Sequence, residues 1–273
     1  MKPIDFPLWL AIAILPLDGF AAAMPPQLDD HGRAGYAEFR RALPHRAFAI
    51  APGGAWSWRG EMETPELAMQ AALDDCRNHA RRACLPYALD DQVVFKPRDW
   101  AQAWRPYPGA AQLARAPVGI KPGQRFPDLL WRDAGGREHK VSTQRGSVVL
   151  LHFWGSWCPP CQREMPDLHK LYKRLKAAPN IRFVFLPVRE AAAISRVWLR
   201  GRGIEVPLAD AGARAEKEGV FPLADGGTLR DRDLARAFPT TYILDRHGGV
   251  LFAHIGPVTD WLELEPLLRD AAR

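Results

Sequence analysis

Cysteine is scarce in this sequence. The 273 residues contain only Cys76, Cys84, Cys158 and Cys161, too few for a small scaffold held mainly by disulfides. Only the last two form a C-x-x-C motif, and no His-x₃₋₅-His pair lies near it. A closed zinc site needs further cysteine or histidine ligands, usually as a second pair of this kind. The motif therefore favours a redox-active pair over half of a zinc site.

Long hydrophobic segments are also few. The apolar run from Phe6 to Leu17 is shorter than the roughly 20 residues that a membrane-spanning helix needs. Lys2 precedes this run and Ala21–Ala23 follow it, a pattern typical of a secretory signal peptide. We therefore predict that residues 1–23 are an export signal and that no transmembrane anchor remains after cleavage. A buried N-terminal helix is the alternative.

The sequence has little excess charge of either sign. Its 37 basic and 31 acidic residues give a formal net charge of +6, and arginine clusters such as Arg40–Arg41 mostly have acidic residues close by. There is no basic helix and no patch of interleaved basic and aromatic residues. We therefore expect a solvated surface and no nucleic-acid partner.

A small α+β accessory domain is predicted for residues 24–96, because the length suits two modest domains. Two short strands, 47–50 and 55–58, flank a glycine-rich turn. The Thr-Pro pair at 64–65 is typical of a helix start, and residues 87–95 return as a strand or hairpin. This part resembles a small module of exported bacterial proteins, a resemblance that transfers no function.

Cys76 and Cys84 lie eight residues apart within this domain. On one uninterrupted helix they would be separated by roughly 12 Å, whereas a disulfide needs Cα atoms within about 7 Å. Either the helix ends near residues 79–82 and the chain doubles back, or both thiols stay free. A structural disulfide is the natural outcome in an exported protein, and a second redox couple is the alternative.

The next segment, residues 97–123, is rich in proline, as is typical of a linker between domains. Because it also contains tryptophan, we expect it to pack on a domain. Several aromatic residues of the first domain and the linker form either a core or a binding groove, and core positions are the more frequent case. These residues are Trp56, Trp58, Trp100, Trp104 and Tyr107.

The centre of the sequence is the stretch from Val148 to Pro166. Its first seven residues form a short β-branched and aromatic run, which predicts a buried strand. The two prolines that follow Cys158 suit the first turn of a helix, so this cysteine lies at a helix N-terminus, where the thiolate is favoured. Cys161 follows one turn later. The sequence therefore predicts a redox-active dithiol, because an inert bridge over so short a loop would stabilise the fold little.

Two motifs together resemble one family. Trp157-Cys-Pro-Pro-Cys161 followed by Arg163–Pro166, and later Phe238–Asp245 with His247–Gly249, are similar to the bacterial TlpA/ResA-like thiol-disulfide oxidoreductases. The resemblance runs from about Phe126 to the C-terminus. It implies an α/β fold for residues 124–273, namely a thioredoxin-like domain whose central mixed sheet is flanked by helices.

The resemblance also implies what the domain does. A periplasmic reductase of protein disulfides is expected, with protein thiols and disulfides as substrates and a membrane or periplasmic electron donor. No cofactor or metal is expected beyond the dithiol. A disulfide-forming or isomerising enzyme is one alternative, and a periplasmic copper or zinc carrier that uses the two cysteines is another.

Site residues follow from the same resemblance. Cys158 would attack the substrate disulfide and Cys161 would resolve the mixed disulfide. Glu164 would tune the acidity of the cysteines; the alternative is an exposed glutamate in the first helical turn. His152 would move a proton; the alternative is a hydrogen-bonded core residue. The residues expected to bind substrate are Trp157, Phe238, Pro239 and Thr240, with Pro239 in a cis peptide bond.

One segment departs from the family. The stretch 207–237, just before Pro239, is longer than expected and polar. A solvated insertion and a specificity flap over the cysteines are the two interpretations, since a long loop beside a binding site is uncommon without a function.

Overall fold

The computed structural model describes residues 24–80, 82–213, 218–258 and 260–273, so the predicted export signal lies outside the described residues. In chain order the elements are α1 (Asp30–Arg41), β1 (Ala47–Ala51), β2 (Ala55–Arg59), α2 (Pro65–His79), β3 (Leu85–Leu89), β4 (Gln92–Val93), α3 (Pro97–Ala103), α4 (Ala110–Arg115), β5 (Leu130–Arg132), β6 (Glu138–Lys140), the 3₁₀ turn η1 (Val141–Gln144), β7 (Val148–Trp154), α5 (Pro159–Leu175), β8 (Ile181–Pro187), α6 (Ala192–Arg200), β9 (Val220–Pro222), β10 (Thr228–Arg230), α7 (Asp231–Leu234), β11 (Thr240–Leu244), β12 (Val250–Ile255), the 3₁₀ turn η2 (Trp261–Leu264) and α8 (Glu265–Ala271).

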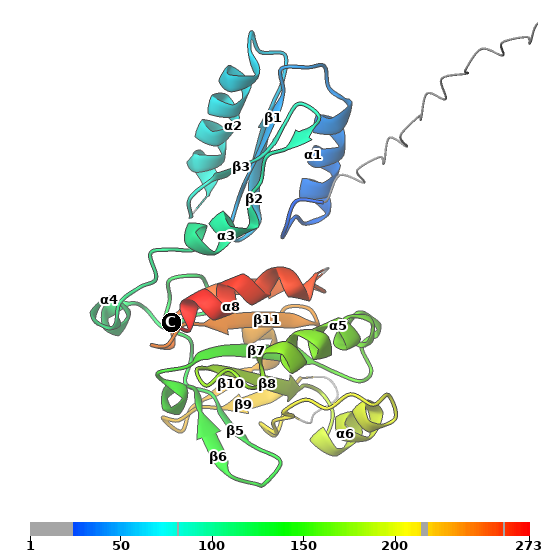
Figure 1. Cartoon of the computed structure of the whole chain (residues 1–273). Coiled ribbons are helices and arrows are strands. Elements are labelled where there is room, and N and C mark those ends of the chain that lie inside the picture. The colour runs from blue at the N-terminus through cyan, green and yellow to red at the C-terminus, as the bar shows by residue number, and fades with distance from the viewer. Residues whose placement is uncertain (1–23, 81, 214–217, 259) are drawn as a thin grey trace, which may run out of the picture.

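The first lobe is a four-stranded sheet between two helices, with strand order β2-β1-β3-β4 (Figure 1). Alternation along β1 separates two cores. Phe48 and Ile50 pack with Tyr36 and Phe39 of α1 on one face. On the other face the alanines of β1 meet Ala68, Ala72 and Cys76 of α2. Helix α1 was not predicted from the sequence.

Helix α2 begins and ends where the sequence indicates. The Thr64 hydroxyl accepts a hydrogen bond from the Leu67 N–H at 3.2 Å, and Pro65 is the first helical residue. The helix stops at His79 and the chain doubles back, so the Cα atoms of Cys76 and Cys84 are 6.2 Å apart and their sulfurs form a disulfide. This bridge belongs to the α2 side of the first lobe and is not part of the second lobe's core.

The predicted linker contains two short helices, and α3 connects the cores of the two lobes. Trp100 is buried in the first lobe's core, and Trp104 in that of the second, with exposed fractions of 3% and 1%. Beyond them, Arg105 and Tyr107 both donate to the Asp270 carboxylate of α8, at 2.5–2.9 Å. The segment therefore packs against both lobes.

The first-lobe tryptophans are half-buried: Trp56 and Trp58 pack against the core, and both also line a surface pocket that contains no residue of the linker. The Trp56 ring stacks on Phe48 with centroids 5.6 Å apart, and it fits against α1 where Gly32 and Gly35 lack side chains. A Cβ atom at Gly35 would lie 2.2 Å from the Trp56 ring. Trp58 packs at the edge of the same core.

The second lobe contains a mixed sheet of order β12-β11-β7-β8, in which β7 and β8 are parallel and β11 is antiparallel to both of its neighbours. Helices α5 and α8 and the turn η2 pack on one face, and Trp198 of α6 contacts Trp154 there. The hairpins β5–β6 and β9–β10, with α7, cover the other face. Helix α5 continues unbroken through Pro166.

The described part of segment 207–237 is folded onto the sheet. Phe221 of β9 is fully buried against Phe153 at 5.4 Å between ring centroids, and Leu234 and Ala235 join the same core. The interpretation as a solvated insertion is therefore wrong for these residues. In the described ranges, no helix combines the length and the apolar character needed to cross a membrane.

Candidate active site

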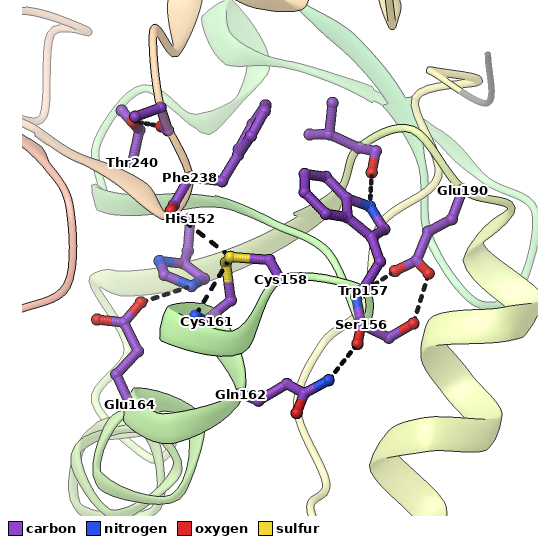
Figure 2. Close-up of a disulfide and its surroundings, with 12 residues drawn as sticks. His152, Ser156, Trp157, Cys158, Cys161, Gln162, Glu164, Glu190, Phe238 and Thr240 are labelled. Atoms are coloured by element: carbon purple, nitrogen blue, oxygen red, sulfur yellow. Dashed lines mark hydrogen bonds and ion pairs between the residues drawn. A yellow bond between two sulfur atoms is a disulfide. The ribbon is translucent and has the colours of Figure 1, made fainter. Parts of the chain in front are cut away.

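The two C-x-x-C cysteines lie where β7 ends and α5 begins. Cys158 is the N-cap of α5, its sulfur accepts a hydrogen bond from the Cys161 N–H at 3.3 Å, and the two sulfurs form a disulfide with Cα atoms 5.3 Å apart (Figure 2). Cys158 retains 3% of its surface and Cys161 none. Only Cys158 therefore offers any surface to an approaching molecule.

A buried glutamate fixes the loop before Cys158. Glu190 accepts hydrogen bonds from the Ser156 N–H, the Ser156 hydroxyl and the Ser195 hydroxyl, at 2.5–2.6 Å. Gln162 donates to the Ser156 carbonyl from the other side, at 2.5 Å. Sequence reasoning missed Glu190, and no motif marks it, because it follows a different strand 34 positions after Ser156.

Aromatic rings lie around the reactive sulfur. Trp157 is 45% exposed, donates its ring N–H to the Val188 carbonyl at 2.9 Å, and meets the Phe238 ring edge-on at 5.6 Å. The Phe238–Pro239 peptide bond is cis, and the Phe238 carbonyl oxygen is 3.5 Å from the Cys158 sulfur. When Cys158 is a thiol, its S–H can donate to this oxygen.

Thr240 does not fit the substrate-binding role that the sequence suggested. Its residue surface is fully buried, and its hydroxyl donates to the Ala237 carbonyl at 2.7 Å. The side chain therefore stabilises the turn that contains Pro239 and is shielded from any bound substrate.

His152 and Glu164 form a buried pair beside the disulfide (Figure 2). The His152 Nε2 and Glu164 Oε1 atoms are 3.4 Å apart, and neither atom has a hydrogen-bond partner in the described structure. The other ends are held: His152 Nδ1 is 3.0 Å from the Thr241 hydroxyl, and Glu164 Oε2 accepts from the Val258 N–H at 2.9 Å. Glu164 is 5% exposed, so its interpretation as an exposed first-turn residue is wrong.

Burial shifts both pKa values away from the charged forms. It lowers the pKa of His152 from 6.5 to about 3 and raises the pKa of Glu164 from 4.5 to about 8. Near neutral pH the pair therefore holds one proton and no net charge. We interpret the 3.4 Å contact as a neutral imidazole facing a protonated carboxyl, because both side chains are buried and a charge on either one would be costly.

This pair predicts an unusual dependence of stability on pH. Between about pH 4.5 and 6.5 the folded and unfolded chains hold equal numbers of protons on His152 and Glu164, so their contribution is constant. From about 6.5 to 8 the folded chain holds one more proton, so the free energy of unfolding falls as pH rises, by up to about 2 kcal/mol. Below about 4.5 the unfolded chain holds one more, so stability falls towards pH 3.

Glu164→Gln should remove the decline between pH 6.5 and 8 that the pair causes, because the variant has no carboxyl to ionise. Denaturant unfolding of the oxidised protein at pH 5.5, 6.5, 7.5 and 8.5 measures this. Exposed Glu138 of β6 provides the control, since Glu138→Gln should keep the wild-type profile. Parallel profiles for all three proteins would show that Glu164 is ionised in the fold and would contradict the assignment.

The described residues contain no cluster of three or more histidine, cysteine or acidic side chains arranged to hold a metal ion. The pair Cys158–Cys161 is thus surrounded by aromatic rings, one carbonyl, one helix N-terminus and a neutral buried pair. Such a site can exchange electrons through sulfur, and the buried pair beside it can accept a proton once Glu164 ionises, above about pH 8.

Comparison with known proteins agrees with this geometry. The redoxin family model matches residues 121–267. The chain is 30% identical over 143 residues to thioredoxin-like protein YneN of Bacillus subtilis, covering 52% of this chain and 76% of that protein. It is also 30% identical over 142 residues to the thiol-disulfide oxidoreductase ResA of Geobacillus kaustophilus, covering 52% and 74%.

Among solved structures, a secreted thiol-disulfide isomerase from Corynebacterium glutamicum aligns over 55% of this chain and 86% of its own, with 23% identity and a TM-score of 0.43. The ResA and YneN matches confirm the resemblance expected from the sequence. Because the redoxin model spans more than half of the sequence, this chain belongs to the redoxin family.

Proposed function

We propose that the chain is an exported thiol-disulfide oxidoreductase that reduces protein disulfides through Cys158 and Cys161. The observation that supports this most directly is the position of Cys158, the N-cap of α5 and the only cysteine of the pair with exposed surface. The relative ResA is named a thiol-disulfide oxidoreductase, which is the same class of activity. Export rests on the predicted signal and on the Cys76–Cys84 disulfide, a bond typical of oxidising compartments.

The exchange proceeds in two steps that conserve electrons. The Cys158 thiolate attacks one sulfur of the substrate disulfide, a new S–S bond joins the two proteins, and the second substrate sulfur leaves as a thiolate that takes up a proton. Cys161 then attacks the Cys158 sulfur, which closes the Cys158–Cys161 disulfide and releases the first substrate sulfur. The substrate gains two electrons and two protons, and an external dithiol donor must return them to the chain.

We propose that the buried pair of His152 and Glu164 accepts the proton that the Cys161 thiol loses in the resolving step. The His152 imidazole lies between the disulfide and Glu164 (Figure 2). Above about pH 8 the ionised Glu164 and neutral His152 together can accept a proton from the Cys161 thiol. Glu164→Gln should therefore slow the resolving step at pH 8–9 relative to the wild type, and equal resolving rates in both proteins would contradict this role.

The direction of exchange is tested by the reduction potential. An oxidising enzyme needs a strongly stabilised reduced form. Among the described residues, the Cys158 sulfur accepts one hydrogen bond, from the Cys161 N–H, and it faces the Phe238 carbonyl oxygen, which does not stabilise a thiolate. We therefore expect a potential near that of thioredoxin, about −270 mV, and far from the roughly −120 mV of a strong oxidant.

Equilibration of the protein with defined ratios of reduced and oxidised dithiothreitol, followed by alkylation of free thiols, measures this potential. The Cys76→Ser, Cys84→Ser double variant keeps the titration to one pair of cysteines. A midpoint above about −180 mV would reverse the assignment and favour disulfide formation or isomerisation.

A further inference from the structure

Arg189, in the loop that follows β8, lies against the aromatic surface beside Cys158. Its guanidinium carbon is 5.2 Å from the centroid of the Phe238 ring. Phe238 in turn contacts the Trp157 ring, and its carbonyl oxygen lies 3.5 Å from the Cys158 sulfur. Arg189 is therefore connected to the reacting sulfur through one residue, Phe238, which contacts both.

Segment 207–237 holds Arg189 in this place. The Arg189 Nε atom is 2.5 Å from Asp231 Oδ2, and the same oxygen accepts from the Gly219 N–H at 3.0 Å. Asp231 is fully buried. Burial alone would raise its pKa, but the hydrogen bonds from Arg189 and the Gly219 N–H hold the pKa below its usual value. Asp231 therefore stays ionised and fixes the side chain from the inner side.

The outer edge of the guanidinium remains available. The Arg189 side chain is 26% exposed, and in the described residues no hydrogen bond or ion pair engages its two terminal nitrogens. The nearest other carboxylate on this loop, Glu190, is buried and already accepts hydrogen bonds from Ser156 and Ser195. Two parallel N–H groups in one plane match the two oxygens of a carboxylate.

We propose that Arg189 selects protein disulfides in which an aspartate or glutamate lies next to the attacked cysteine. The aromatic rings of Trp157 and Phe238 contact the apolar part of such a segment, while the terminal N–H groups of Arg189 bind its carboxylate. Because Asp231 neutralises the arginine, the selection acts at contact and not at long range. This inference rests on the proposed disulfide exchange and gives segment 207–237 a role in it.

The experiment uses three cyclic peptides that share one disulfide and differ only in the residue beside one cysteine: Glu, Gln or Lys. The second-order rate of their reduction by the pre-reduced full-length protein is measured by acid quench and mass spectrometry. We expect the Glu peptide to react about five- to tenfold faster than the Gln peptide, with the Lys peptide slowest. High salt should reduce the difference.

Two variants test the residue itself. Arg189→Gln combined with Asp231→Asn removes the cation without leaving a buried carboxylate unpaired, and should bring the three rates within about twofold of one another. Arg182→Gln is the matched control: Arg182 is exposed near the start of β8, about 20 Å along the strand from Arg189, and its loss should leave the preference unchanged.

The outcomes are distinct. Equal rates for the three peptides in the wild type, or a Glu preference that survives in the double variant, would overturn the inference about Arg189 while leaving disulfide exchange intact. Reduction of none of the peptides would instead overturn the proposed function. If the double variant does not fold, equal rates for the three peptides with the wild-type protein still overturn the inference.

Discussion

Replacing Cys161 by serine is expected to trap the chain in a stable mixed disulfide with its substrate. Cys158 keeps its exposed surface and its position at the start of α5, so it still attacks. The intramolecular attack that resolves the intermediate is lost, and proximity makes such a step faster than attack by external thiols by orders of magnitude. The Cys161 side chain is fully buried, and serine occupies nearly the same volume, so the fold should persist.

Trapped partners are measured by non-reducing electrophoresis of extracts from cells that express the tagged variant, and they are identified by mass spectrometry after reduction. Cys158→Ser is the matched control, one helical turn away. It should form no adduct and lose essentially all exchange activity. Adducts of equal yield in both variants would show that a cysteine other than Cys158 also reacts, and would contradict the assignment of Cys158 as the attacking residue.

The parts of the site that are local in sequence were predictable. The strand to Trp154, the turn and the helix start at Cys158 all follow from neighbouring residues, because β-branched runs, prolines at a first helical turn and N-caps act over a few positions. Pro239 was assigned through resemblance to a family. The preceding residue, Phe238, contacts Cys158 through its carbonyl oxygen, across 80 positions that no local pattern spans.

Long-range contacts decide what the remaining site residues do. Glu164 is on a helix whose sequence allows an exposed glutamate, and it is buried because Val258, 94 positions later, covers it. Arg189 is fixed by Asp231, 42 positions away. Thr240 is buried because the turn at Ala237 folds back onto it. Burial of a polar side chain follows from the packing of separate elements, so single-sequence patterns do not predict it.

Helix α3 shows how a segment that reads as a linker joins two cores. Trp100 packs edge-on with Phe95 of the first lobe at 5.8 Å, and Trp104, just after the last residue of α3, packs with Phe252 of the second lobe at 6.0 Å. The two tryptophans also contact one another at 6.4 Å. Two side chains only four positions apart thus belong to the cores of different lobes. In Figure 1, α3 lies between the first-lobe sheet and α8.

Trp104→Ala should therefore destabilise the second lobe strongly. The indole is 1% exposed among the residues of that core, and truncating a large buried aromatic side chain costs about 3–5 kcal/mol of unfolding free energy. Trp100→Ala is the matched control. It removes the same side-chain volume four positions earlier in the sequence, but from the core of the first lobe. Hydrogen exchange followed by mass spectrometry separates the two effects, since β7 reports on the second lobe and β1 on the first.

We expect β7 amides to lose protection in Trp104→Ala with β1 little changed, and the reverse in Trp100→Ala. The distinction follows from the contacts: Trp104 belongs to the cluster that contains Leu150 and Trp154 of β7, and Trp100 to the cluster that contains Phe48 of β1. Equal loss in both strands for each variant would mean that the lobes unfold as one unit. In that case α3 would act as part of a single continuous core, and the accessory lobe would contribute directly to the stability of the redox site.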